Sequence, residues 1–281
     1  MVQRIAALLI VVFVFSLPAS AQDTSARAAA DEYLTVVGTE TVFPRLKSEI
    51  LDRMLQLEPF QRPEARDTLE RIAETSFDPE IIRSKILDRV EADLTAEEIQ
   101  PAIDDNKTEF GQKMVAMEKA ASTVETRRYL TQHWKQILEK YDTDPEKTDA
   151  VLEIMDVTET LERTTKTAKT AALTVIGVRM KSVPAEQRPP MDVVASKIDE
   201  AIAKEQPNLL KLLLADYLFT YRSASTEDLQ RYLDILKGNR MVSDVFYNAL
   251  DEVANVQLEE FLTEVYAQTD LDPETSYKTS K

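Results

Sequence analysis

The sequence is poor in the residues that make sharp turns, and it contains no cysteine. Its 281 residues include 4 Gly, no Cys and one His, and this glycine content is far below an average usage of about 7%. Phosphate-cradling loops, tight turns and β-bulges are therefore excluded as common features, because these conformations recruit glycine for positive φ. Without cysteine there is no disulfide, no thiolate nucleophile and no thiolate metal site.

The charge balance is strongly acidic, and this makes one class of partner, nucleic acid, unexpected. The chain has 50 acidic and 34 basic side chains and a formal net charge of −16. Such a surface repels a phosphate backbone, so nucleic acid is not an expected partner. The hydrophobic content of 43% is enough to bury a core, and the length predicts one or two domains.

Residues 1–21 are typical of a secretory signal peptide. Arg4 is a short basic start, Ile5 to Phe15 is an unbroken apolar run, and Ala19-Ser20-Ala21 is a small-x-small cleavage site. The apolar run is shorter than the ~20 residues of a transmembrane helix, and no later run in the sequence approaches that length. The sequence therefore predicts cleavage after Ala21, export, and a periplasmic location in a Gram-negative host.

From Gln22 onward the hydrophobic periodicity is helical, and alternating strand patterns are scarce. Asp78-Pro79 and Asp144-Pro145 are helix-start signals, and Thr95 to Glu98 fits a capping box. Proline at 63 and between 184 and 190 predicts loops. The expected fold class is an all-α helical bundle with long antiparallel helices.

Two segments carry more specific patterns. The first predicts a heptad seam on one helix of about thirty residues, through Ala150, Ile154, Val157, Leu161, Thr164, Ala168, Ala171, Val175 and Val178. The second, Asn208 to Phe219, is apolar around most of the helix circumference, which is typical of a central helix. We therefore expect Leu213 to be buried.

The chain also contains an internal echo, which predicts two divergent copies of one multi-helix unit. Thr95 to Gln100 is similar to Ser225 to Gln230, and Tyr33 to Thr41 is similar to Val151 to Thr160. The predicted organisation is a signal peptide at 1–21, a first unit at 22–141, a second unit at 142–267 and a polar tail at 268–281.

In these segments the chain resembles the bacterial domain-of-unknown-function family numbered 2059. Tyr33-Leu34 and Gly38 match the family's opening helix, Leu94 to Ile99 its acidic start, and Gly111-Gln112-Lys113 the end of its last motif. Asp105 to Glu109 replaces that motif's Phe-Tyr-x-Ser-Pro, which is a clear departure. The resemblance implies an exported helical protein and no activity, because the family's own function is unsettled.

The segments around Thr108 and around Gly238 predict a helix–break–helix corner in each copy. Thr108 can cap a new helix through its hydroxyl, with Gly111 in the first turn, where the missing side chain permits close packing. In the second copy, Gly238 is expected to end a helix in a left-handed conformation, and Asn239 to start the next. Gly38, Gly111 and Lys113 are thus motif positions for which we expect structural roles.

No residue pattern supports a metal site. Glu-x-x-His pairs are absent around His133, where positions 129, 130, 136 and 137 are Tyr, Leu, Gln and Ile. Asp142, Asp144 and Glu146 are spaced like the start of a calcium loop, but Lys147 replaces the required turn glycine. A helix cap is the expected role of that run, and neither a cofactor nor a metal is expected.

Catalytic motifs are equally scarce. The sequence has no Gly-x-Ser-x-Gly and no Ser followed by Lys three residues later, and a Ser-His-Asp set depends on His133 alone. Acidic pairs are frequent, for example Glu97 with Glu98, Asp104 with Asp105, and Asp105 with Glu109. Such pairs serve as acid and base in glycosidases, but in so acidic a chain solvated faces are the expected location.

Two further patterns allow a structural or a binding role. Met114, Met117 and Val124 form an apolar stripe, which is more often core than a partner site. One basic stretch includes Arg127, Arg128, Lys135 and Lys140. These cations can pair with the chain's own carboxylates or with an anionic partner.

The leading hypothesis is a non-enzymatic envelope protein that binds another protein or a peptide in a groove between its units. The first alternative is a carboxylate-dependent hydrolase of envelope polymers. The second is a carrier of a lipid or small apolar ligand, with Asn208 to Phe219 lining its cavity. An open apolar groove favours the binder, two facing carboxylates in an acidic cleft favour the hydrolase, and an enclosed apolar cavity favours the carrier.

Overall fold

The structure is a computed structural model that describes residues 19–39, 42–56, 58–181 and 183–268. Within these ranges every regular element is a helix, which confirms the all-α prediction. The elements in chain order are α1 (Ala19–Val36), α2 (Val42–Leu55), η2 (Glu58–Gln61), α3 (Pro63–Ser76), α4 (Pro79–Asp93), α5 (Ala96–Lys107), α6 (Glu109–Ala121), α7 (Val124–Tyr141), α8 (Pro145–Val157), α9 (Thr160–Lys181), η3 (Ala185–Gln187), α10 (Met191–Thr220), α11 (Thr226–Gly238) and α12 (Arg240–Gln268).

The predicted helix starts are confirmed by their caps. Asp78 accepts hydrogen bonds from the backbone N–H groups of Glu80 and Ile81 before α4, and Asp144 accepts one from Lys147 before α8. Thr95 and Glu98 form a reciprocal capping box before α5. Each cap satisfies donors that a helix start otherwise leaves unpaired.

The buried apolar side chains form two clusters. The first joins α1, α3, α4, α5 and α12, with Val178 of α9. The second joins α6, α7, α8, α10 and α11. The predicted units at 22–141 and 142–267 each contribute to both clusters, so the tertiary core does not follow the boundary at residue 141.

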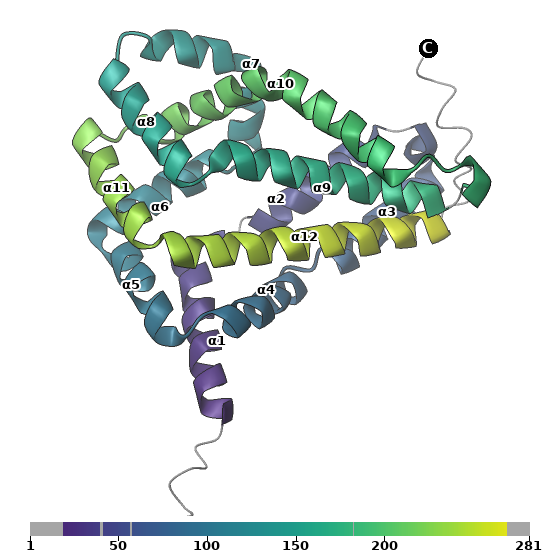
Figure 1. Cartoon of the computed structure of the whole chain (residues 1–281), viewed down its shortest axis with the longest axis horizontal. Helices are drawn as coiled ribbons and strands as arrows, with labels where there is room; N and C mark the ends of the chain where they lie inside the picture. Colours follow the sequence, from purple (N-terminus) through teal and green to yellow (C-terminus); the bar gives the residue numbers. More distant parts are fainter. Residues whose placement is uncertain (1–18, 40–41, 57, 182, 269–281) are drawn as a thin grey trace, which may run out of the picture.

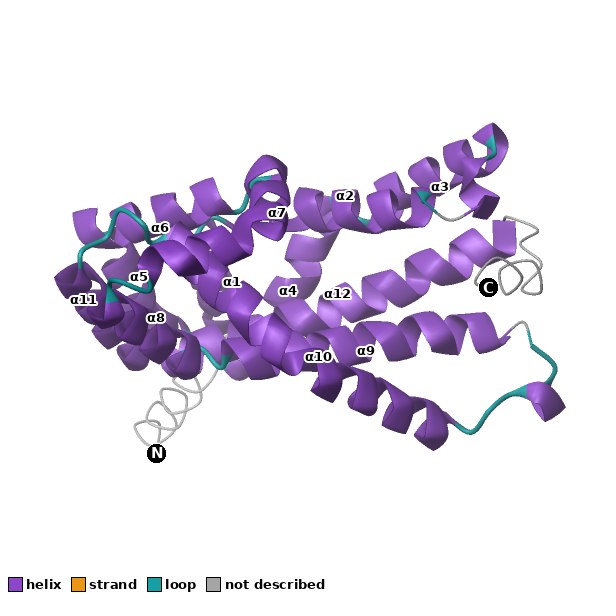
Figure 2. Ribbon diagram, turned by 90° about the horizontal axis from the view of Figure 1, so that it is seen from above, coloured by secondary structure: helices purple, strands orange, loops and turns teal. Residues whose placement is uncertain are grey.

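The longest helices connect the two ends of the molecule. In Figure 1, α9 and α12 run side by side across the centre, and α9 also packs against α10. Figure 2 shows α5, α6, α8 and α11 gathered at one end, and α3 with the last turns of α12 at the other. Among the described helices, none is long and apolar enough to cross a bilayer.

The single helix predicted through Ala150 and Val178 is wrong, because the chain breaks between α8 and α9. Glu159 has a φ of 51°, a left-handed conformation that interrupts a helix. The Thr158 hydroxyl donates to the carbonyl oxygen of Ile154 at 2.8 Å. The Thr158 N–H donates to the same oxygen at 3.0 Å, so the helical bonding ends at Thr158 and heptad spacing does not reveal the left-handed residue that follows.

The prediction that Leu213 is buried in a central leucine-rich helix is also wrong. This segment is the C-terminal part of α10, where Ala215 and Leu218 are buried. Leu213 is only half-buried against the second cluster, and Leu210 keeps 38% of its exposure. The helix therefore lies at the edge of the packed core and leaves part of its apolar surface open.

Other sequence predictions have no decisive test in the fold. The packing of α1 against α4 and α5 has a counterpart in that of α8 against α10 and α11, in keeping with the echo, but the duplication stays a prediction. Of the predicted signal peptide, residues 1–18 lie outside the described ranges, and residues 19–21 form the start of α1. Residues 269–281 of the predicted tail also lie outside them.

Candidate functional site

Two of the motif positions are glycines that a larger residue does not fit. Gly38 follows α1 with a φ of 77°, which a side chain disfavours, and its N–H donates to the Thr35 carbonyl at 3.2 Å. Gly111 lies in the first turn of α6, where an added Cβ would come within 2.3 Å of the Asp105 carbonyl oxygen. The close approach of α5 to α6 therefore requires the missing side chain.

Lys113, the third motif position, links two corners of the fold. Its ammonium donates to the Asp228 carboxylate at 2.6 Å, and Asp228 belongs to the capping box of α11. A second link crosses the same junction, because the Asn239 amide donates to the Asp105 carboxylate at 2.9 Å. The α5–α6 and α11–α12 corners are thus held together by polar side chains.

The corners differ in one respect from the prediction. Thr108 caps α6 as expected, accepting from the Gly111 N–H at 2.9 Å. Gly238, however, is the last residue of α11, and among the described glycines only Gly38 has a positive φ. The predicted left-handed Gly238 is wrong because Asn239, with a φ of −102°, ends the helix instead.

The sequence candidates for metal and acid–base chemistry are dispersed. The Nδ1 of His133 donates to the Tyr129 carbonyl at 2.8 Å, and its ring stacks on that of Tyr129. Glu98 is used in a cap, where hydrogen bonds from Thr95 lower the pKa of its carboxyl. Asp144 caps α8, as expected of that acidic run. The described residues contain no group of three or more potential ligands placed to hold a metal.

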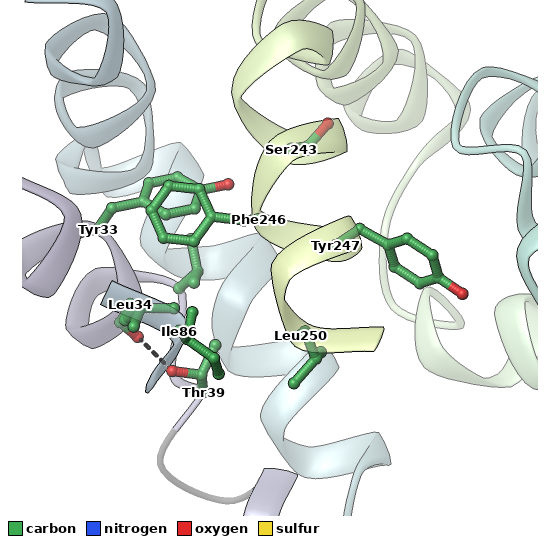
Figure 3. Close-up of a pocket in the computed structure, with 9 residues that line it drawn as sticks. Tyr33, Leu34, Thr39, Ile86, Ser243, Phe246, Tyr247 and Leu250 are labelled. Carbon is green, nitrogen blue, oxygen red and sulfur yellow. Dashed lines mark hydrogen bonds between the residues drawn. The ribbon is translucent and has the colours of Figure 1, made fainter. Parts of the chain in front are cut away.

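A small apolar pocket lies where α1 and α4 meet α12 (Figure 3). The rings of Tyr33 and Phe246 lie against each other with centroids 4.5 Å apart, and Thr39 closes one side by donating to the Leu34 carbonyl at 3.0 Å. The pocket has a volume of about 150 Å³, which is below the roughly 300–1,000 Å³ of most small-molecule sites. The remaining lining residues are Val37, Ile86, Ser243, Tyr247 and Leu250.

A larger open groove lies over α8, α9 and α10, and we call it the α8–α10 groove. It has a volume of about 540 Å³ and is lined by Leu152, Met155, Asp156, Glu159, Leu161, Glu162, Thr165, Gln206 and Leu210. Leu152 and Leu210 each keep 38% of their exposure. Among the described residues that line the groove there are three carboxylates and no Lys or Arg. Glu159 is already paired with Arg240 and Arg163, so the groove combines an apolar floor with a rim made negative by Asp156 and Glu162.

A carboxylate enclosed by tyrosines lies between the two core clusters. The hydroxyls of Tyr221 and Tyr232 both donate to Oε1 of Glu118, each at 2.6 Å. Burial raises the pKa of the Glu118 carboxyl, and these two hydrogen bonds oppose that rise. Burial, with the nearby charge of Glu118, also raises the pKa of Tyr33 to about 12.

Glu118 also borders a polar pocket of about 160 Å³, which we call the Glu118–Asp216 pocket. It is lined by Glu118, Ala121, Ser122, Arg127, Asp216, Tyr217, Thr220 and Tyr221. Arg127 of α7 pairs with Oδ2 of Asp216, as the basic stretch allowed. The other carboxylate oxygen, Asp216 Oδ1, is buried and has no hydrogen-bond partner. Such an atom is rare in a native fold.

Neither of these carboxylates belongs to a motif that we recognised in the sequence. A signal was present in both cases, because each is a charged residue inside an apolar stretch. Glu118 follows Met114 on the buried face of α6, and Asp216 interrupts the leucine-rich run of α10. The two come from helices almost a hundred residues apart, so only the tertiary fold brings them to one pocket.

Comparisons with known proteins add no relative: no protein-family model matches the sequence, and no curated protein or solved structure does. The resemblance to the family numbered 2059 therefore rests on the short motifs alone and stays a prediction.

The raised pKa of Glu118 leads to a prediction about stability. Because the folded carboxyl holds its proton more tightly than the unfolded one, whose pKa is about 4.3, stability falls as pH rises from that value through the folded pKa. Glu118→Gln removes this term. We expect its unfolding free energy, relative to the parent, to increase as pH is raised from about 4.5 toward neutrality. Urea denaturation at a series of pH values measures the difference.

Glu200→Gln, on the exposed side of α10, makes the same change of charge and is the control. It should show little of this trend. A Glu118→Gln difference that does not vary with pH would show that the folded carboxyl titrates like an unfolded one.

Proposed function

We propose that this chain is an exported, non-enzymatic protein of the bacterial envelope that binds a segment of another protein or a peptide. The apolar run of residues 5–15 and the Ala19-Ser20-Ala21 site support export and a periplasmic location. The observation that carries the binding proposal is the α8–α10 groove, which is the largest of the three pockets described above. It lies within the predicted second unit, not between the two units.

The groove also specifies the chemistry of the partner. Leu152 and Leu210 offer apolar surface whose burial contributes about 25 cal/mol per Å². Asp156 and Glu162 place negative charge along the rim, whereas Glu159 is already paired with Arg240 and Arg163. The complementary partner is a segment that inserts an apolar side chain and carries Lys or Arg beside it, because opposite charges speed the encounter and fix its orientation.

The two alternatives have less support. Of the acid pairs on which the hydrolase hypothesis depended, Glu98 is used in a cap and Glu97 is exposed. The Glu118–Asp216 pocket does hold two carboxylates, but Arg127 pairs with Asp216, two tyrosines bond Glu118, and its volume of about 160 Å³ is small for a polymer substrate. The apolar pocket at Tyr33 is too small for an acyl chain, and Asn208 to Phe219 does not line it. A binding role uses the surface that the leucine-rich helix leaves open.

The test is binding of a fluorescein-labelled amphipathic peptide of leucine and lysine, measured by anisotropy. We expect Leu210→Lys to weaken binding at least roughly tenfold, which corresponds to about 1.4 kcal/mol. The substitution removes apolar contact and places a like charge opposite the peptide. A matched leucine–glutamate peptide should not bind, because the rim repels it.

Val256→Lys is the matched control, because Val256 on α12 keeps 41% of its exposure and is outside the groove. Both variants change the net charge equally, so their difference isolates the groove from general attraction to an acidic protein. Equal weakening by the two variants, or equal binding of the two peptides, would contradict the proposal.

A further inference from the structure

The Glu118–Asp216 pocket has an excess of hydrogen-bond acceptors. Asp216 is only 9% exposed, and its Oδ1 is buried without a partner. Both tyrosine hydroxyls donate to the same oxygen of Glu118, so neither reaches its other oxygen. A buried acceptor without a donor costs about 1–3 kcal/mol. Asp216 Oδ1 is therefore the atom in this pocket that can accept a further hydrogen bond.

The charge of the pocket points to the same missing group. At a pH above the raised pKa of Glu118, its lining includes two carboxylates, Glu118 and Asp216, and one guanidinium, Arg127. An anion in this space would face both carboxylates, whereas a monovalent cation would balance the excess. Because the Arg127 side chain is 40% exposed, one edge of the pocket reaches solvent. A cation can therefore enter from that edge.

We propose that the Glu118–Asp216 pocket binds a primary ammonium group, with the carboxylates of Asp216 and Glu118 as acceptors. An ammonium has three N–H donors and a positive charge, and charge-assisted hydrogen bonds are the strongest of their kind. The volume of about 160 Å³ is close to that of a cavity that holds a benzene molecule. It therefore suits a short aliphatic amine.

The site is independent of the α8–α10 groove. Its lining comes from α6, α7 and the C-terminal part of α10, and no residue is shared with the groove. The amine proposal can consequently hold or fail whatever the result of the peptide experiment.

Calorimetric titration with n-butylammonium chloride tests the proposal. Tetramethylammonium chloride is the matched probe, since it has the same charge and number of heavy atoms but no N–H donor. We expect saturable binding of butylammonium and none of tetramethylammonium. N-acetyl-lysine methylamide, titrated in parallel, tells a lysine side chain from a free amine by which of the two binds more tightly. If butylammonium does not bind, or if both cations bind equally, the proposal is overturned.

Three variants locate the binding. Asp216→Asn should weaken butylammonium binding at least roughly tenfold, and Asp199→Asn, an exposed change on the same helix, should not. Arg127→Gln keeps the pocket polar but removes the competing guanidinium, so it should tighten binding by roughly tenfold. If the Arg127–Asp216 pair had only a structural role, its removal would not tighten butylammonium binding. Weaker binding in Arg127→Gln would overturn the assignment even if Asp216→Asn does not fold.

Discussion

Replacing Phe261 by alanine should destabilise the protein by about 3–5 kcal/mol, the usual cost of truncating a buried Phe. Phe261 of α12 is fully buried, and its ring lies 5.2 Å from that of Phe77, centroid to centroid. The loss combines the transfer energy of the ring with a cavity that the surrounding helices fill only in part. Equilibrium denaturation in urea measures the change.

The position of Phe261 makes this effect informative about the architecture. Phe261 belongs to α12, the last described helix, whereas Phe77 directly follows α3, much earlier in the chain. Val256→Ala, on the exposed side of α12, is the control and should change stability by roughly 0.5 kcal/mol or less. If Phe261→Ala cost no more than this control, α12 would not pack into the first cluster as the structure describes.

Lys147→Met should destabilise the protein by about 2–4 kcal/mol, because it leaves one buried and one partly buried carbonyl without their donor. Lys147 is only 6% exposed. Its ammonium donates to the carbonyl oxygens of Ala224 at 2.7 Å and Arg222 at 3.1 Å. These carbonyls belong to the turn between α10 and α11, so the lysine attaches that turn to α8. Methionine keeps an unbranched apolar stem as far as the ε carbon and removes the ammonium group with its charge and donors.

Lys169→Met provides the comparison for this variant. Lys169 pairs with Asp199 on the surface at 2.7 Å, with both side chains more than one-third exposed. Exposed pairs contribute about 0–1 kcal/mol, so this variant should be nearly neutral. A Lys147→Met protein as stable as Lys169→Met would mean that water replaces the ammonium at both carbonyls. Thermal unfolding followed by circular dichroism ranks the two variants against the parent.

Lys147 also illustrates the limit of reading side-chain roles from local sequence. In the sequence, Lys147 stands out only because it replaces the glycine that a calcium loop requires. The cap at Asp144 follows correctly from that mismatch. Nothing nearby indicates that the ammonium is buried, because its acceptors are some seventy-five residues away. The burial lowers the pKa of Lys147, mainly through loss of solvation, and this too depends on the distant turn.

The sequence by itself determined the properties that follow from local chemistry. Helical periodicity and the scarcity of glycine specified an all-α chain, and the caps at Asp78, Thr95 and Asp144 follow from side chains within three residues of the N–H groups they accept from. The close approach at Gly111 was likewise visible from the corner it occupies. These features depend on neighbours along the chain, so reading a few residues together is sufficient.

Only the tertiary structure decided the features that depend on distant contacts. Heptad spacing continues through residues 158 and 159, but the left-handed Glu159 ends the helix there. The leucine-rich run is apolar whether it is buried or not, and its half-exposure follows from which helices reach it. The meeting of Glu118 with Asp216 depends on how α6 packs against α10. Burial and charge pairing arise from the whole packed assembly, because the neighbours that remove solvent come from other parts of the chain.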